Sequence, residues 1–413
     1  MVIIHVMNGF TKPRLLDALV ADSMRVMPAV VITGARQTGK STLARALGPA
    51  SRRFHTLDDL DVLDLAKRNP QALIDGTHGV TLDEIQRAPE LLLSVKSTID
   101  RNRRAGRFVM TGSANFLMMQ SVSESLAGRA AYCTLWPMTR REQQGAGRAG
   151  LWSELFDTDP ELWPELLSDE HSVAEDWKSL ARRGGFPTPA LQLRTARDRA
   201  IWFEGYARTY VERDLRDIAA VASLPDFRRL MIATTLRLGQ VLNQTELGRD
   251  TTIPQPTVHR WLNALETSYL LVRLPAYAVN RTKRLIKSPK LYWSDTGLAM
   301  HIAGHEQPTG AMLENVILSD LLAWRDGSSN RAELYYWRTH AGEEIDFVVE
   351  NNTTLLPIEI KATAKPRLAD AQHLLSFRAE YGSHVPAALL LHTGSTIEWL
   401  APGILAVPWW RVV

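Results

Sequence analysis

The sequence predicts a multidomain α/β protein with four parts. Residues 1–150 alternate short apolar runs with helical patterns, which is typical of a parallel sheet covered by helices. Residues 225–284 show three helical patterns and then a strand, and residues 285–413 have a second α/β pattern. Residues 151–224, between the first two patterns, are predicted to form an acidic insertion and a helical lid or connector.

The composition is that of an ordinary globular protein. Of 413 residues, 45% are hydrophobic and 23% charged, and the formal net charge of +3 points to no particular partner. The single cysteine, Cys133, excludes an internal disulfide and a four-cysteine zinc site. No apolar run approaches the ~18 residues that span a bilayer, and the N-terminus lacks the pattern of a signal peptide. We therefore expect a cytoplasmic protein without a membrane partner.

The first part is predicted to contain five strands joined by helices. The intervening helical patterns cover residues 89–100 and 115–126. The strands are predicted at residues 29–34, 53–57, 79–84, 107–112 and 130–135.

One segment matches the phosphate-binding loop pattern G-x-x-x-x-G-K-[ST] at every fixed position. It consists of Gly34, Ala35, Arg36, Gln37, Thr38, Gly39, Lys40 and Ser41, and Thr42 directly after it is a further candidate for nucleotide binding. It follows an apolar strand and opens a helix, which is the context the motif requires. Its glycines let backbone N–H groups close around a β-phosphate. Lys40 should reach the β- and γ-phosphates, and the Ser41 hydroxyl should bind Mg²⁺. ATP and Mg²⁺ are therefore the expected cofactors.

Further candidates for the same site lie at strand ends. Asp83 is expected to hold Mg²⁺ through its water shell, and Glu84 to polarise the attacking water, which favours hydrolysis over binding alone. Ser113 is a candidate sensor of the γ-phosphate, although a plain strand-to-loop turn explains it equally well. Arg129 is a candidate arginine finger for a phosphate in its own chain or in the neighbouring subunit of a homo-oligomer.

Residues 225–284 are predicted to form a winged helix-turn-helix. The third helix, from Thr257, would read the DNA major groove. A basic stretch that suits phosphate contacts follows this unit. The candidate DNA contacts are His259, Arg260, Asn263, Arg281, Lys283 and Arg284. The alternative is a protein–protein module or a fixed lid on the first part.

Residues 285–413 have the pattern of a nuclease-like core. Asp346 and Glu359 fall on adjacent predicted strands and could hold Mg²⁺, with Lys361 positioning a water for attack on a phosphodiester. Glu314 would approach from the preceding helix. The same kind of core also serves as a binding scaffold, so cleavage and scaffolding both stay open.

Together these motifs resemble the bacterial and archaeal AAA-type ATPases (AAA+/ASCE class) with a C-terminal domain of unknown function 4143. The connecting segments 184–187 and 291–297 also look like that family, and the likeness runs from about Leu16 to Leu391. The resemblance implies an ATPase with a restriction-endonuclease-like PD-(D/E)xK tail and links to DNA, toxin–antitoxin or mobile-element functions. The acidic segment 151–176 departs from the family pattern.

Two functions follow from these expectations. The first is a Mg²⁺-dependent ATPase that acts on DNA or is switched by it, with metal-dependent nuclease activity as an open addition. The second is an ATP-controlled regulatory switch, antitoxin-like or bound to a protein partner, in which the nuclease-like domain is an inactive scaffold.

Overall fold

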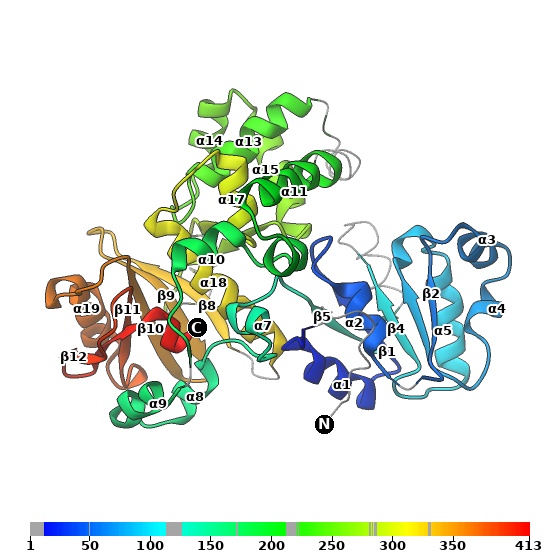
Figure 1. Cartoon of the computed structure of the whole chain (residues 1–413), viewed down its shortest axis with the longest axis horizontal. Coiled ribbons are helices and arrows are strands. Elements are labelled where there is room, and N and C mark those ends of the chain that lie inside the picture. The colour runs from blue at the N-terminus through cyan, green and yellow to red at the C-terminus, as the bar shows by residue number, and fades with distance from the viewer. Residues whose placement is uncertain are drawn as a thin grey trace.

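The computed structural model describes residues 12–48, 50–112, 126–170, 172–211, 223–280, 287–328 and 332–413, together with Val221, Thr282 and Arg284. Figure 1 shows three bodies: the N-terminal sheet with its helices on the right, a group of helices at the top, and the C-terminal sheet on the left. Within the described residues, no helix is long and apolar enough to cross a membrane.

The N-terminal body is a five-stranded parallel sheet in the order β2-β3-β4-β1-β5. Its strands are β1 (Ala29–Thr33), β2 (Arg53–Thr56), β3 (Val80–Asp83), β4 (Phe108–Thr111) and β5 (Ala130–Thr134). Its helices are α1 (Leu16–Val26), α2 (Lys40–Ala46), α3 (Leu60–Arg68), α4 (Pro70–Ile74), the short η1 (Ile85–Arg87) and α5 (Leu91–Arg101).

The five strands predicted from the sequence are thus confirmed. The three central strands, β1, β3 and β4, are buried along their whole length, because helices cover both faces of a parallel sheet. The helix predicted over residues 115–126 lies outside the described residues except for Leu126.

The connecting part is helical. Its elements are α7 (Arg140–Gln144), α8 (Trp152–Asp157), η2 (Pro160–Leu162), α9 (Trp163–Asp169), α10 (Trp177–Arg183), η3 (Thr188–Gln192), α11 (Ala196–Tyr206) and η4 (Ala207–Val211). The acidic segment forms α8 and α9, which lie beside the C-terminal sheet and not over the N-terminal one (Figure 1).

Two carboxylates of the acidic segment form ion pairs with arginines of the connector. Glu170 and Glu175, at its end, form salt bridges with four arginines: Arg140, Arg141, Arg148 and Arg183. The Arg140 and Arg141 side chains are almost fully buried, so these carboxylates offset charges that would otherwise be costly to bury. These two carboxylates of the segment thus support the connector through its buried arginines.

The upper body contains three successive helices and a two-stranded antiparallel sheet, in the predicted order. Its elements are α13 (Leu224–Leu236), α14 (Gln244–Thr251), α15 (Gln255–Thr267), β6 (Leu271–Leu274), β7 (Lys290–Trp293) and α17 (Thr296–Ala303). The Asn243 side chain caps α14, as expected, by accepting from the amides of Thr245 and Glu246. Val258, Trp261 and the two leucines of α15 are buried at helical spacing.

The C-terminal body is a six-stranded mixed sheet in the order β12-β13-β11-β10-β9-β8. Its elements are α18 (Gly310–Gly327), β8 (Glu333–Arg338), β9 (Glu344–Asn351), β10 (Thr354–Lys361), η5 (Leu368–Ala371), α19 (Gln372–Tyr381), η6 (Gly382–His384), β11 (Ala388–His392), β12 (Glu398–Ala401), β13 (Ile404–Pro408) and α20 (Trp409–Val412). Sequence reasoning missed β12 and β13. Strand β12 is a short, half-exposed edge strand with little apolar pattern.

The three bodies are in contact. The Trp136 indole N–H, after β5, donates to Asp326 on α18 at 2.7 Å. One continuous apolar cluster extends from the connector through the upper helices into the inner face of the C-terminal sheet. The domains are therefore packed on one another and are not beads on flexible linkers.

Candidate functional site

The phosphate-binding loop stands between the end of β1 and the start of α2. Gly34 and Gly39 have φ values of 139° and 98°, in the region that favours glycine. A Cβ at Gly34 would lie 2.3 Å from the Leu135 carbonyl oxygen, so no larger residue fits there. Both glycines of the motif are thus required by the backbone path of the loop.

Lys40 begins α2, and its side chain is turned back into the loop. Its ammonium donates to the carbonyl oxygens of Gly34 at 3.0 Å and Ala35 at 2.7 Å. Burial lowers the pKa of Lys40 to about 8, although the carboxylates of Glu84 and Asp83 act in the opposite direction. The ammonium therefore lies inside the loop and close to both acids.

Asp83 is the last residue of β3 and Glu84 follows it, and β3 is separated from the loop strand β1 by β4. Thr111, at the end of β4, links them: its hydroxyl donates to the buried Asp83 carboxylate and accepts from the Glu84 amide at 3.2 Å. Glu84 adopts a left-handed backbone conformation with φ 58°. Its carboxylate, half-buried, accepts from Gln86. The two acids are held by a defined network at the carboxyl edge of the sheet.

Other elements hold the loop from outside. Arg14 donates to the carbonyl oxygens of Thr38 at 2.8 Å and Trp136 at 2.7 Å, and it pairs with Glu142 at 3.0 Å. The Tyr206 hydroxyl, at the end of α11, donates to the Arg36 carbonyl at 3.3 Å. Sequence reasoning found neither contact, because a lone arginine or tyrosine far away along the chain carries no local signal.

The upper body also reaches this edge. The hydroxyls of Thr33, the last residue of β1, and Tyr269, between α15 and β6, are 2.9 Å apart. The Tyr269 ring also packs edge-on against Trp136. The residue before the phosphate-binding loop is thus hydrogen-bonded to the upper body.

Two predicted members of the site are not placed with it. Ser113 lies outside the described residues. Arg129 precedes β5, and its carbonyl accepts from the amide of Ala29, the first residue of β1. It is therefore at the amino-terminal edge of the sheet, separated by the strand length of roughly 16 Å from the loop, and it pairs with Asp100 at 2.6 Å. Within one chain, Arg129 does not approach the phosphate site. A role across a subunit interface stays a prediction.

The residues of the loop fit a magnesium-bound nucleoside triphosphate. The loop backbone and Lys40 supply donors for phosphate oxygens, and the start of α2 adds a partial positive charge. Ser41 is half-buried at the first turn of α2, and the Asp83 carboxylate lies at the end of β3, on the same edge of the sheet. Hydroxyl and carboxylate oxygens are the ligands that Mg²⁺ prefers.

A second cluster of charged residues lies where the C-terminal sheet meets the upper body. The structure brings together the four residues predicted from the sequence: Glu314, Asp346, Glu359 and Lys361. Lys361 donates to Glu359 at 2.6 Å. Burial lowers the pKa of Lys361, but the carboxylates of Glu359 and Asp346 outweigh burial and raise it. Burial and the Asp346 charge raise the pKa of Glu314 and of Glu359 to about 8.

Sequence reasoning missed the central member of this cluster, Lys290. Its ammonium lies 2.5 Å from Glu344, 3.3 Å from Asp346 and 4.0 Å from Glu314. Burial lowers the pKa of Lys290, but these three carboxylates outweigh it and hold the pKa above its ordinary value. Lys290 is the last residue of the basic stretch 281–290, which the sequence predicts to contact DNA phosphates. Only its burial in the structure reveals its role.

As arranged, the carboxylates do not fit a divalent cation. No group of three or more acidic, histidine or cysteine side chains among the described residues has the geometry to hold a metal ion. The ammonium of Lys290 stands between Glu314 and Asp346, where a shared ion would have to lie. The metal role predicted for Asp346 and Glu359 is therefore not supported by this arrangement.

The predicted DNA contacts separate into two groups. His259 and Arg260 are exposed on α15, and Asn263, half-buried, contacts both His259 and Arg273. Arg284 is 7% exposed, donates to Tyr335 at 2.8 Å and pairs with Glu350 at 2.5 Å. As a buried and neutralised cation it is not available to a phosphate, so its assignment as a DNA contact was wrong. Arg281 and Lys283 lie outside the described residues.

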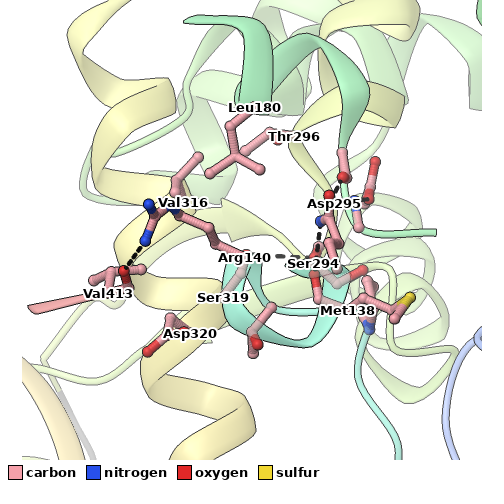
Figure 2. A pocket seen from close by; sticks show the side chains of 15 residues that line it. Met138, Arg140, Leu180, Ser294, Asp295, Thr296, Val316, Ser319, Asp320 and Val413 are labelled. Carbon is pink, nitrogen blue, oxygen red and sulfur yellow. Dashed lines mark hydrogen bonds between the residues drawn. The ribbon is translucent and has the colours of Figure 1, made fainter. Parts of the chain in front are cut away.

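A small polar cavity lies at the junction of the connector and the C-terminal body (Figure 2). Its volume is about 30 Å³, which admits a water or two but no nucleotide. The Asp320 side chain on α18 borders it, and in Figure 2 Arg140 reaches across toward Val413. This cavity belongs to the packing of the domains and is distinct from the phosphate-binding loop.

The fold and the loop define a P-loop nucleotide-binding protein, and comparison with known proteins agrees. An AAA domain matches residues 27–144, and two domains of unknown function, DUF8612 and DUF4143, match residues 174–309 and 309–412. The chain therefore carries an AAA-type ATPase domain at its N-terminal end and a DUF4143 domain at its C-terminal end.

Two mycobacterial relatives cover almost the whole chain. The uncharacterized proteins Rv2008c of Mycobacterium tuberculosis and Mb2031c of Mycobacterium bovis are each 30% identical to it over 403 residues, which is 91% of this chain and 83% of the relative. The chain belongs to the family of these two proteins. Among solved structures, it is similar to the Walker-type ATPase paby2304 of Pyrococcus abyssi, with 14% identity over 70% of this chain and 98% of the other, at a TM-score of 0.43.

Proposed function

We propose that this protein is a Mg²⁺-dependent ATPase whose turnover responds to DNA bound by its helix-turn-helix unit. The observation that carries the ATPase part is the position of Lys40 within the loop, with Asp83 and Glu84 held by Thr111 at the same edge of the sheet. Phosphate donors and a candidate general base thus converge at one edge of the sheet.

Each residue of the site has a separate task. Backbone N–H groups of the loop bind the phosphates, and Lys40 gives up its carbonyl partners to bind the β- and γ-phosphates. Ser41 and Asp83 would hold the Mg²⁺, which supplies charge neutralisation when bound. Glu84 accepts a proton from the attacking water, and Thr111 fixes the backbone at Glu84.

The hydrolysis step is tested by Glu84→Gln. We expect this variant to bind ATP with unchanged affinity and to hydrolyse it about 10²–10⁴-fold more slowly, because only the proton acceptor is lost. Lys40→Ala should lose binding itself. Glu90→Gln, an exposed acid at the start of α5, is the matched control and should behave as wild type. Parental turnover in Glu84→Gln would show that another group activates the water.

The DNA part of the proposal depends on α15. Its apolar side is buried in the upper body, while His259 and Arg260 are exposed. The His259 ring contacts Gln244, the first residue of α14, at 3.2 Å. Three helices followed by the β6–β7 hairpin are the elements of a winged helix, whose third helix enters the major groove. The exposed polar and basic side of α15 supports this use.

Arg260→Glu tests the DNA contact. We expect weaker binding of duplex DNA and a salt dependence of the affinity that is shallower by about one unit, since one phosphate contact is lost. DNA-stimulated ATP turnover should fall in parallel. Arg68→Glu on α3 is the matched control, because it makes the same charge change at an exposed residue, which pairs with Asp64 at 3.0 Å. Equal DNA affinity in wild type and Arg260→Glu would favour a protein partner for this helix.

The C-terminal domain favours the second candidate function in one respect. Its carboxylate cluster contains Lys290 and does not fit a divalent cation. A nuclease-like core that holds a lysine in place of a metal ion would serve as a scaffold in an ATP-controlled switch. ATP that is held tightly and turned over slowly, with no effect of DNA, would support that function over the first.

A further inference from the structure

The carboxylate cluster of the C-terminal domain is built around an ammonium group. Lys290 is 1% exposed, and its ammonium contacts Glu344 and Asp346, which share one face of β9, and Glu314 of α18. A lysine buried this deeply is stable only when carboxylates compensate its charge.

The cation and most of the anions come from different bodies. Lys290 opens β7, the second strand of the upper hairpin, where it pairs with Leu274 of β6. Asp346 and Glu344 belong to β9 of the C-terminal sheet. The next residue but one on β7, Tyr292, donates to Glu314 at 2.8 Å. Strand β7 thus inserts two side chains into the cluster, and the hairpin supplies its cation.

The cluster still has unused capacity for a cation. One carboxylate oxygen of Glu359 is buried without a hydrogen-bond partner, while its other oxygen accepts from Lys361. Asp346 uses one oxygen for the Ile360 amide at 2.9 Å and the other for Lys290. Removing the ammonium of Lys290 would leave the carboxylates of Glu314, Glu344 and Asp346 without the cation that they share.

We propose that Lys290 is the resident cation of this cluster: its ammonium excludes a divalent metal ion, and a latent site for Mg²⁺ or Mn²⁺ becomes available only when that ammonium is withdrawn. The inference is independent of the ATPase proposal, since it concerns residues of the hairpin and the C-terminal sheet alone. It implies that the nuclease-like core cannot carry out metal-dependent cleavage while β7 stays in place.

Manganese binding to the full chain, measured by the paramagnetic resonance of free Mn²⁺ without nucleotide, tests this proposal. Every protein carries Asp83→Asn, which removes the carboxylate expected to hold Mg²⁺ at the ATPase edge. We expect the parent protein and its Asp346→Asn form to bind Mn²⁺ identically. Lys290→Gln should gain a site with affinity at least about tenfold higher, and Asp346→Asn should abolish that gain.

Lys290→Arg is the matched control, because it keeps a positive charge and should gain no site. Thermal unfolding gives a second readout: Mn²⁺ should raise the Tm of Lys290→Gln and leave the parent unchanged. Binding by the parent protein that depends on Asp346 would overturn the proposal, as would a folded Lys290→Gln that gains no Mn²⁺ site. If Lys290→Gln fails to fold, Lys290→Met is titrated in its place, and a folded Lys290→Met that gains no Mn²⁺ site overturns the proposal.

Discussion

At the scale of single residues, burial determines what each charged side chain can do. Lys40 and Lys290 are both buried lysines, yet the pKa of Lys40 is lowered to about 8 and the pKa of Lys290 is raised. Lys40 has carbonyl oxygens as its nearest partners, whereas Lys290 has carboxylates. The first is therefore ready to bind an incoming anion, and the second is already neutralised.

The pKa of Lys40 leads to a prediction about pH. Phosphates require the charged form, and above about pH 8 the free protein must take up a proton before it binds ATP. We expect the Kd for ATP to rise about tenfold between pH 7 and pH 9. Isothermal titration across this range measures the change, and it should show proton uptake on binding. An affinity that is flat over these two pH units would mean that Lys40 keeps its charge in the free loop.

At the scale of elements, the end of β1 is linked to the turn between α15 and β6. The Thr33 and Tyr269 hydroxyls, 2.9 Å apart, connect the residue before the phosphate-binding loop to the hairpin that holds Lys290. A nucleotide that shifts this loop would thereby act on the upper body directly. This contact is a physical route between the two parts, and its coupling energy can be measured.

A double-mutant cycle measures this link. Thr33→Val and Tyr269→Phe each remove one hydroxyl and preserve the shape of the side chain. We expect the two losses in unfolding free energy to be non-additive by about 0.5–1.5 kcal/mol, the usual net contribution of one hydrogen bond. Urea unfolding of the four proteins provides the values. Strict additivity would show that the two hydroxyls do not interact in solution, and the Tyr269 ring would then act only through its packing on Trp136.

At the scale of the whole molecule, buried polar residues join the connector to the C-terminal body. Asp320, on α18, is fully buried and accepts from the Gly150 amide at 2.7 Å and the Trp152 indole at 2.6 Å. Burial raises the pKa of Asp320 to about 6, although these two hydrogen bonds act to lower it. The folded protein thus favours the protonated form of this carboxyl group more than water does.

Asp320 therefore predicts how stability depends on pH. Its folded pKa is above that of the unfolded chain, so the folded state holds the extra proton between about pH 4 and pH 6, and stability falls as the pH rises through this window. Asp320→Asn keeps an oxygen acceptor and removes the buried charge. We expect it to be more stable than wild type at pH 8, by at most roughly 3 kcal/mol, with the difference vanishing below about pH 4. Thermal unfolding at pH 4, 6 and 8 checks the sign, and a less stable variant at pH 8 would show that the charged form is favoured.

The sequence by itself determined the parts of this protein that depend on neighbouring residues. The loop from Gly34 to Ser41, the strand ending in Asp83 and Glu84, and the four acidic and basic positions of the C-terminal cluster follow from local spacing and strand period. The tertiary structure alone decided which cations are used internally. Lys290 meets Asp346 across 56 positions, and Arg284 meets Glu350 across 66, so no local pattern could separate these buried cations from exposed ones such as Arg260. Charge is a property of the residue, but its availability depends on what packs around it.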